Sequence, residues 1–207
     1  LNQVSIFAMQ SEGNKERIIN LGAPIQRVVN VGNIKFDGLS IKEAAAPRFG
    51  LNPATPILIA GSTHSGEEKI ILDAYKAIKK QFSAWQLIIA PRHIERSAEV
   101  MGIINEAGEK AILFSQLSNE LQNSSAVIVV DTIGHLRQLY AHAELVFVGK
   151  SLCGGGGQNV IEPGLYGKAI VVGPLMENFK DILKAFKDNH AIVQVADADE
   201  FKRVVLD

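Results

Sequence analysis

Several features that would mark particular protein classes are scarce or absent in this chain of 207 residues. The single cysteine, Cys153, cannot form a disulfide within the chain, which suits a reducing compartment. No apolar run approaches the ~20 residues of a membrane-spanning helix. The first residues, LNQVSIFAMQ, lack the charged segment of a signal peptide. The chain begins at leucine, and we expect it to be a fragment or a processed form of a longer protein.

Charge of either sign is not in excess, because 21 Lys and Arg face 22 Asp and Glu. No basic cluster is denser than Lys79-Lys80, which argues against a nucleic-acid partner or a polybasic membrane surface. The histidines and Cys153 do not have the spacing of a structural zinc site, so we expect no metal. The Walker A motif, the hydrolase nucleophile elbow and the complete dinucleotide fingerprint are also missing.

What the sequence does contain is a 47% hydrophobic composition arranged as alternating strands and helices. A helix is predicted over Glu67–Gln81, where apolar residues recur on one face. The continuous apolar strands predict an α/β fold, a Rossmann-like parallel sheet with helices on both faces and ligands at the carboxyl ends of the strands. The predicted strands are Val4–Met9, Val28–Val31, Pro56–Ala60, Gln86–Ala90, Ala126–Val130, Leu145–Val148, Ala169–Val172 and Ala191–Val195.

The most informative segment is the four-glycine run Gly154–Gly157, which follows a predicted strand. Glycine amides can face a phosphate closely, and a helix that begins after the run would add its positive end. Asn159 and Glu162 would then lie three residues apart on the first helical turn, where a carboxylate can accept hydrogen bonds from a ribose. Phosphate beside a diol describes a nucleotide or a nucleotide-sugar. The alternative is a glycine-rich loop that only turns a corner.

A second polar loop follows the strand that ends at Ala60. Ser62, with Thr63 and the local amides, is a candidate phosphate contact, and His64 lies in the same loop. Ser65 and Glu68 have the spacing of a helix capping box, which would explain them without a ligand.

Two further loops complete the candidate site. Pro91, Arg92 and His93 end one strand, and the Arg92 guanidinium can hold a phosphate with two hydrogen bonds. Arg96, in the same loop, is more simply explained as the partner of Glu95 or Glu99. After another strand, a helix is expected to begin at Gly134, with Asp131 as a possible cap, and the backbone there could contact a base.

Taken together, these loops resemble the bacterial 3-deoxy-D-manno-octulosonic acid (Kdo) transferases of lipopolysaccharide assembly. The matching motifs occur in the same order over nearly the whole chain: Gly32-Asn-Ile-Lys-Phe-Asp37, Ala60-Gly-Ser-Thr-His-x-Gly-Glu-Glu68, Ala90-Pro-Arg-His-x-Glu-Arg96, Val130-Asp-Thr-x-Gly134, Gly149-x-Ser151, Gly-Gly-x-Asn159-x-x-Glu162-Pro163 and Gly173-Pro-x-x-x-Asn-Phe179.

The resemblance implies the C-terminal, donor-binding half of a GT-B glycosyltransferase. It implies that residues 1–31 are the tail of the N-terminal acceptor domain, 32–38 a linker, and 39–207 the CMP-Kdo-binding domain. No catalytic residue is then expected in this chain, because the family's catalytic carboxylate lies in the N-terminal domain. The residues expected to bind the donor are Ser62, His64, Pro91, Arg92, His93, Ile133, Gly134, His135, Ser151, Gly156, Gly157, Asn159, Val160, Ile161 and Glu162.

The resemblance also implies an activity: transfer of Kdo from CMP-Kdo to a lipid A precursor at the cytoplasmic side of the bacterial inner membrane, with this chain itself soluble. CMP-Kdo would be the substrate, with no cofactor and no metal, and lipid A would be held by the other domain. The chain departs from the family at Ser65, His135 and Gln158, which leaves the donor preference open. The alternatives are another GT-B glycosyltransferase or epimerase that uses a UDP-sugar, and a non-catalytic nucleotide-binding module.

Overall fold

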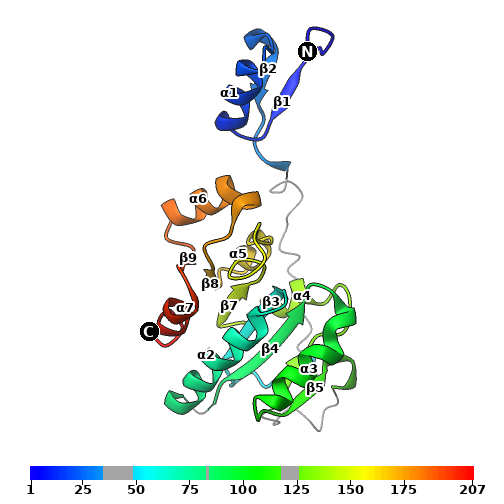
Figure 1. The fold of residues 1–207 in the computed structure, drawn as a ribbon, viewed down its shortest axis with the longest axis vertical. Coiled ribbons are helices and arrows are strands. Elements are labelled where there is room, and N and C mark those ends of the chain that lie inside the picture. Colours follow the sequence, from blue (N-terminus) through cyan, green and yellow to red (C-terminus); the bar gives the residue numbers. More distant parts are fainter. Residues whose placement is uncertain (35–48, 83, 118–125) are drawn as a thin grey trace. The chain divides into compact units, whose positions relative to one another are not determined.

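The computed structural model describes residues 1–34, 49–82, 84–117 and 126–207 (Figure 1). The chain divides into two compact units, Leu1–Ile41 and Lys42–Asp207. Residues 35–38 of the expected linker lie outside the described residues, so the expected domain boundaries stay a prediction.

The first unit is a small strand–helix–strand motif. Strands β1 (Phe7–Met9) and β2 (Val28–Asn30) pair in parallel, and α1 (Glu12–Asn20) connects them. The Ser11 side chain caps α1 by accepting the Asn14 amide at 3.3 Å. Its core consists of Phe7, Ala23 and Val28, with much of its remaining apolar surface exposed.

The second unit is a seven-stranded sheet in which every pair of neighbouring strands is parallel, in the order β5-β6-β4-β3-β7-β8-β9 (Figure 1). Its strands are β3 (Ile57–Thr63), β4 (Gln86–Pro91), β5 (Ala111–Leu113), β6 (Val127–Val129), β7 (Leu145–Val148), β8 (Ala169–Val172) and β9 (Val193–Gln194). Its helices are α2 (Glu67–Gln81), α3 (Ser97–Glu106), α4 (Leu136–Tyr140), α5 (Ile161–Leu165), α6 (Lys180–Asp188) and α7 (Ala198–Val204). The predicted fold class is therefore confirmed.

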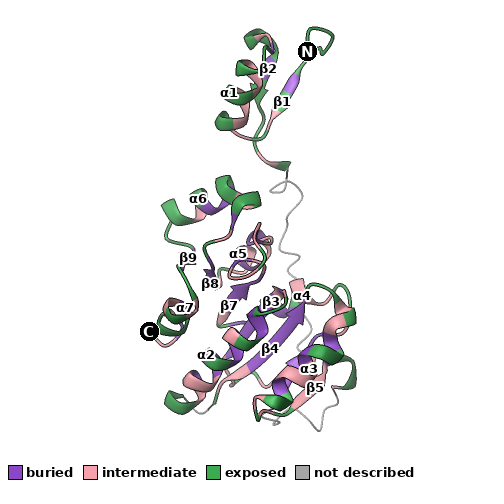
Figure 2. Cartoon of the chain, in the orientation of Figure 1, coloured by how far each residue is buried: buried purple, intermediate pink, exposed green. Residues whose placement is uncertain are grey.

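Both faces of this sheet are buried, as the continuous apolar strands predict (Figure 2). On one face, Leu58 and Leu87 pack in a single cluster with Tyr75 of α2, Val100 of α3 and Phe201 of α7. The alternate strand residues, such as Ile59, point the other way and are equally buried. Helices α4 and α5 contact each other and lie against β3 and β8.

The sequence predicted the central strands better than the ends of elements. The bounds of α2, β7 and β8 agree with the prediction, whereas β1 begins only at Phe7. Strand β3 continues through Thr63, so the first part of the expected loop belongs to the strand, with a register shift between Gly61 and Thr63. The edge strand β5 was missed, because three residues are too short for a periodic signal.

Candidate functional site

The strand order places the candidate site beside β3. Strands β4 and β6 lie on one side of β3 and β7 and β8 on the other, so the chain crosses from β6 over to β7. In open parallel sheets, ligands bind at the carboxyl ends of the strands where the strand order reverses in this way. The loops after β3 and β7, residues 64–66 and 149–160, flank that position. All four polar loops of the sequence analysis follow strands of this sheet.

The buried carboxylate of Glu67 holds these two loops together. Glu67 is the first residue of α2 and is fully buried. Its oxygens accept five backbone amides at 2.8–3.3 Å, those of His64, Lys150, Ser151, Leu152 and Cys153. Amides that converge on one carboxylate form a strong anion site, and here the chain itself supplies the anion. Sequence analysis missed this residue, although a carboxylate pair directly after a strand-end loop is a usable signal.

The contact between the loops also requires glycine at position 149. A Cβ there would meet the Ser62 carbonyl oxygen and would lie 2.7 Å from Thr63 Cα. Ser62, near the end of β3, and Lys150, in the loop after β7, both have a left-handed backbone conformation, with φ of 55° and 57°. Such conformations are unfavourable for residues with a Cβ and persist where surrounding contacts fix them. The Glu67 hydrogen bonds provide that constraint for Lys150.

The glycine run differs from its prediction. The Gly156 amide donates to Glu177 Oε2 at 2.7 Å, and the Gly157 amide donates to the Lys150 carbonyl at 2.9 Å. The amides of Glu177 itself and of Gly156 hold the pKa of the Glu177 carboxyl below its usual value. The expectation that amides near Gly157 face a phosphate is therefore wrong for this conformation, because those amides have partners within the chain.

The Asn159 and Glu162 side chains do lie together, but not on one helical turn. Helix α5 begins only at Ile161, and the Asn159 carboxamide oxygen accepts the Ile161 amide at 3.1 Å. The Asn159 Nδ2 group donates to Glu162 Oε1 at 3.3 Å. With five residues, α5 offers little of the expected helix dipole. Val160 and Ile161 are buried, so neither presents an exposed side chain to a ligand.

Ser151 is a structural residue and not the expected ligand contact. Its side chain is fully buried, donates to the Val148 carbonyl at 2.6 Å and accepts the Gly173 amide at 2.9 Å. Both roles of the hydroxyl are therefore taken within the protein. Ser151 joins the end of β7 to the end of β8 through these two hydrogen bonds.

The loop after β4 presents a free cation beside β3. The Arg92 backbone amide donates to the Thr63 carbonyl at 3.0 Å. The Arg92 side chain is exposed, and its guanidinium has no ion-pair or hydrogen-bond partner among the described residues. Pro91, which ends β4, is buried, while His93 is exposed with its ring 6.1 Å from that of His64. The His64 Nδ1 atom lies 3.1 Å from the Ser62 carbonyl oxygen.

Arg96 has the structural role that was expected for it. It forms ion pairs at 2.8 Å with Glu99 and also with the buried Glu68. Glu68 additionally accepts the Thr63 hydroxyl at 2.9 Å. The Ser65–Glu68 capping box is therefore wrong: Gly66 is the cap residue, in a left-handed conformation, because Glu68 turns inward.

The loop after β6 carries an exposed apolar side chain next to a group of rings. Ile133 is 82% exposed, and Gly134 is exposed beside it. The His135 ring lies 5.3 Å from the ring of Phe114 and 5.5 Å from that of Phe49, and its Nδ1 is 2.8 Å from the Thr132 hydroxyl.

Asp131, in the same loop, does not cap α4, contrary to one of the expectations. Its carboxylate accepts the Ser115 amide at 2.9 Å and the Ser115 hydroxyl at 2.6 Å. Asp131 therefore ties the loop after β6 to the segment that follows β5.

Across residues 1–34, 49–82, 84–117 and 126–207, no three His, Cys, Asp or Glu side chains are grouped so that they could hold a metal ion. Over the same residues, every helix is too short or too polar to cross a membrane.

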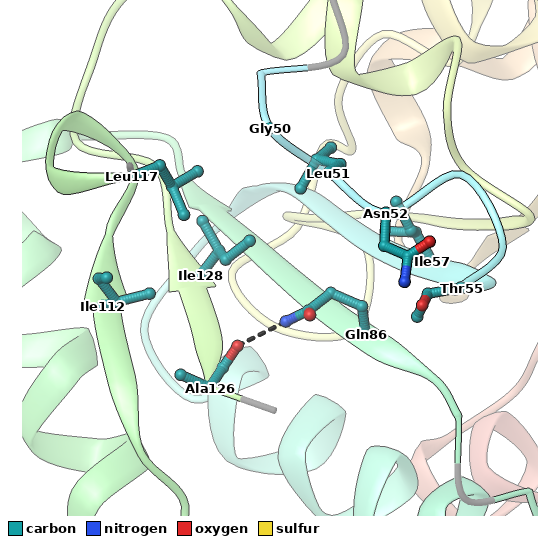
Figure 3. Close-up of a pocket in the computed structure, with 10 residues that line it drawn as sticks. All are labelled: Gly50, Leu51, Asn52, Thr55, Ile57, Gln86, Ile112, Leu117, Ala126 and Ile128. Carbon is teal, nitrogen blue, oxygen red and sulfur yellow. Dashed lines mark hydrogen bonds between the residues drawn. The ribbon is translucent and has the colours of Figure 1, made fainter. Parts of the chain in front are cut away.

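A small pocket lies at the opposite edge of the sheet, at the amino ends of the strands (Figure 3). It is lined by Ile57 and Gln86 at the amino ends of β3 and β4, together with Leu51, Ile128 and others. The Gln86 carboxamide donates to the Ala126 carbonyl at 2.5 Å. The pocket has a volume of about 20 Å³, which is enough for one water molecule and too small for a nucleotide.

Comparison with known proteins decides the family. No family model matches the chain. A crystal structure of the C-terminal CMP-Kdo binding domain of WaaA from Acinetobacter baumannii is 33% identical, with a TM-score of 0.66 over 73% of this chain and 77% of that one. The chain belongs to the Kdo transferase family. The predicted resemblance, and the C-terminal domain of a GT-B glycosyltransferase as the fold, are confirmed.

Curated relatives of the Kdo transferase family extend beyond this chain. The 3-deoxy-D-manno-octulosonic acid transferase of Haemophilus influenzae is 31% identical over 99% of this chain and 49% of its own length. A bifunctional glycosyltransferase/methyltransferase of Fusobacterium nucleatum is 36% identical over 99% of this chain and 32% of its own length. The chain thus spans about half or less of the curated relatives that it matches.

A more distant likeness concerns the fold alone. A UDP-N-acetylglucosamine 2-epimerase from Listeria monocytogenes has a TM-score of 0.62 with only 14% identity, over 99% of this chain and 50% of that one.

Proposed function

We propose that this chain is the donor-nucleotide-binding half of a Kdo transferase, which moves Kdo from CMP-Kdo to a lipid A precursor. The observation that carries the proposal is its 33% identity, over three-quarters of both chains, to a CMP-Kdo binding domain. The strand order supports it, because a ligand site is expected beside β3, where the polar loops gather.

In this proposal, the two sides of the site hold different parts of CMP. Arg92, which is exposed directly after β4, binds the phosphate. Glu162, oriented by Asn159, accepts hydrogen bonds from the ribose hydroxyls. The exposed Ile133, with Gly134 and His135, lies against the base.

The contribution of this half to catalysis is then electrostatic. When the acceptor hydroxyl displaces CMP with inversion at the anomeric carbon, negative charge grows on the departing phosphate. A guanidinium at that position stabilises this growing charge, and so stabilises the transition state more than the ground state. We assign the general base and the lipid acceptor to the N-terminal domain of the family, and the whole enzyme to the cytoplasmic side of the inner membrane.

Calorimetric titration of the chain with CMP, UMP and UDP in one buffer tests the nucleotide. We expect CMP to bind at least about tenfold more tightly than the other two, a difference of ~1.4 kcal/mol. Preference for UDP would contradict the Kdo donor and favour a glycosyltransferase that uses a UDP-sugar. Failure of all three to bind would contradict the claim that this half holds the nucleotide by itself.

Replacement of Glu162 by alanine tests the ribose contact. We expect the variant to bind CMP more weakly by about 1–3 kcal/mol, the usual effect of losing a charged hydrogen-bond partner. Wild-type protein should prefer CMP over 2′-deoxy-CMP, and Glu162→Ala should lose that preference. Glu144→Ala, an exposed carboxylate at the amino end of β7, is the control and should bind as wild type does. An unchanged preference in Glu162→Ala would rule out the ribose assignment.

A further inference from the structure

Lys150 combines an unfavourable backbone conformation with an ammonium group that has no partner among the described residues. Its φ of 57° lies in the left-handed region, which glycine adopts far more readily. Two hydrogen bonds fix it there: its amide donates to Glu67 Oε2 at 2.8 Å, and its carbonyl accepts the Gly157 amide at 2.9 Å. The Lys150 ammonium has no ion-pair or hydrogen-bond partner among the described residues. A strained non-glycine residue at a candidate site points to a function for its side chain.

The lysine side chain extends over the glycine run. A Cβ added at Gly154 would lie 4.0 Å from Lys150 Cγ, and one added at Gly156 would lie 3.9 Å from Lys150 Cε. The aliphatic part of the Lys150 side chain therefore packs across these glycines. Because the amides of Gly156 and Gly157 are already bonded, the Lys150 ammonium is the charged donor that this loop offers to an anion.

Lys150 and Arg92 lie on opposite sides of β3. Arg92 follows β4 and Lys150 follows β7, and these two strands are the neighbours of β3 in the sheet. Strands two places apart are separated by about 10 Å, a distance that two long cationic side chains can bridge from both sides. An anion at the carboxyl end of β3 would thus have one cation on each flank.

We propose that Lys150 binds the phosphate of the donor nucleotide, opposite Arg92, and that Glu67 positions it for this role. The inference rests on the proposed function and adds a residue to the donor site. We assign the phosphate as the partner because the two cations flank the carboxyl end of β3, where a ligand of a parallel sheet is expected. A carboxylate on the transferred sugar has similar chemistry, and the test separates the two because CMP carries no sugar carboxylate.

Replacement of Lys150 by glycine separates binding from folding. Glycine removes the charge and relieves the left-handed strain, so the midpoint of urea unfolding should stay the same or rise. The affinity for CMP should fall about tenfold, while that for cytidine, which has no phosphate, stays unchanged. Lys150→Met should give the same loss of CMP affinity, and Lys150→Arg should restore much of it. Lys202→Met, an exposed lysine of α7, is the control for net charge and should bind CMP as wild type does.

The outcomes distinguish this inference from the proposed function. Unchanged CMP affinity in Lys150→Gly and Lys150→Met would overturn the phosphate contact. This is also the result expected if Lys150 binds the sugar carboxylate, because CMP does not carry that group. Equal losses for CMP and cytidine would overturn it too, since they would indicate a distorted loop. If the wild type binds no CMP, the proposed function fails, and pyrophosphate then serves as the probe. Wild-type binding of pyrophosphate that Lys150→Met loses would still support the anion site, and no binding would overturn it.

Discussion

Glu67→Gln is expected to lower the free energy of unfolding by about 3–5 kcal/mol, although the two side chains have nearly the same shape. The carboxylate accepts five backbone amides in a fully buried position. A carboxamide keeps one oxygen and places an NH2 group against amides that also donate. At least two buried donors would therefore lose their partner, together with the charge that attracts all five.

Urea unfolding followed by circular dichroism measures this effect. Glu144→Gln is the control, because this exposed residue makes no side-chain hydrogen bond among the described residues, and it should change stability by less than about 0.5 kcal/mol. CMP binding by Glu67→Gln should also weaken at temperatures where the variant is folded, since the loops on both sides of β3 lose their connection. A change in stability below about 1 kcal/mol would show that Glu67 does not hold the two loops together.

Gly173→Ala is expected to destabilise the protein by about 2–4 kcal/mol. A Cβ at this position would meet the backbone of Ser151 and lie 2.6 Å from the Leu152 amide nitrogen. These are backbone atoms, which no side-chain rotation can move away. The substitution would also pull the Gly173 amide from the Ser151 hydroxyl, to which it now donates at 2.9 Å.

Gly102→Ala provides the matched comparison. Gly102 lies within α3, and a Cβ there meets nothing within 4 Å. The same substitution should therefore stabilise the protein by about 0.5–1 kcal/mol, the usual advantage of alanine in a helix. Thermal or urea unfolding of both variants checks the prediction. Changes of the same sign in the two variants would refute the packing argument at Gly173.

The candidate site was predictable in part, because residues that follow parallel strands necessarily meet at one edge of the sheet. Arg92 and the Asn159–Glu162 pair could be found in this way, since their strands, β4 and β7, have clear apolar signals. Ser151 could not be assigned from sequence. Its hydroxyl looks available in a polar loop, and only the packed structure shows that it bonds the Val148 carbonyl and the Gly173 amide.

The sequence by itself determined the class of fold, the order of the long elements and the family resemblance. The continuous apolar strands and the periodic α2 are local sequence patterns, which can be read without knowing the tertiary structure around them. Only the tertiary structure decided which polar groups are free. Glu67 accepts amides from residues 83–86 positions away, and the Gly156 amide donates to a residue 21 positions away. The charged ends of the Lys150 and Arg92 side chains, by contrast, have no partner among the described residues. The physical reason is that hydrogen bonds between loops depend on the sheet bringing distant strand ends together, which no local pattern encodes.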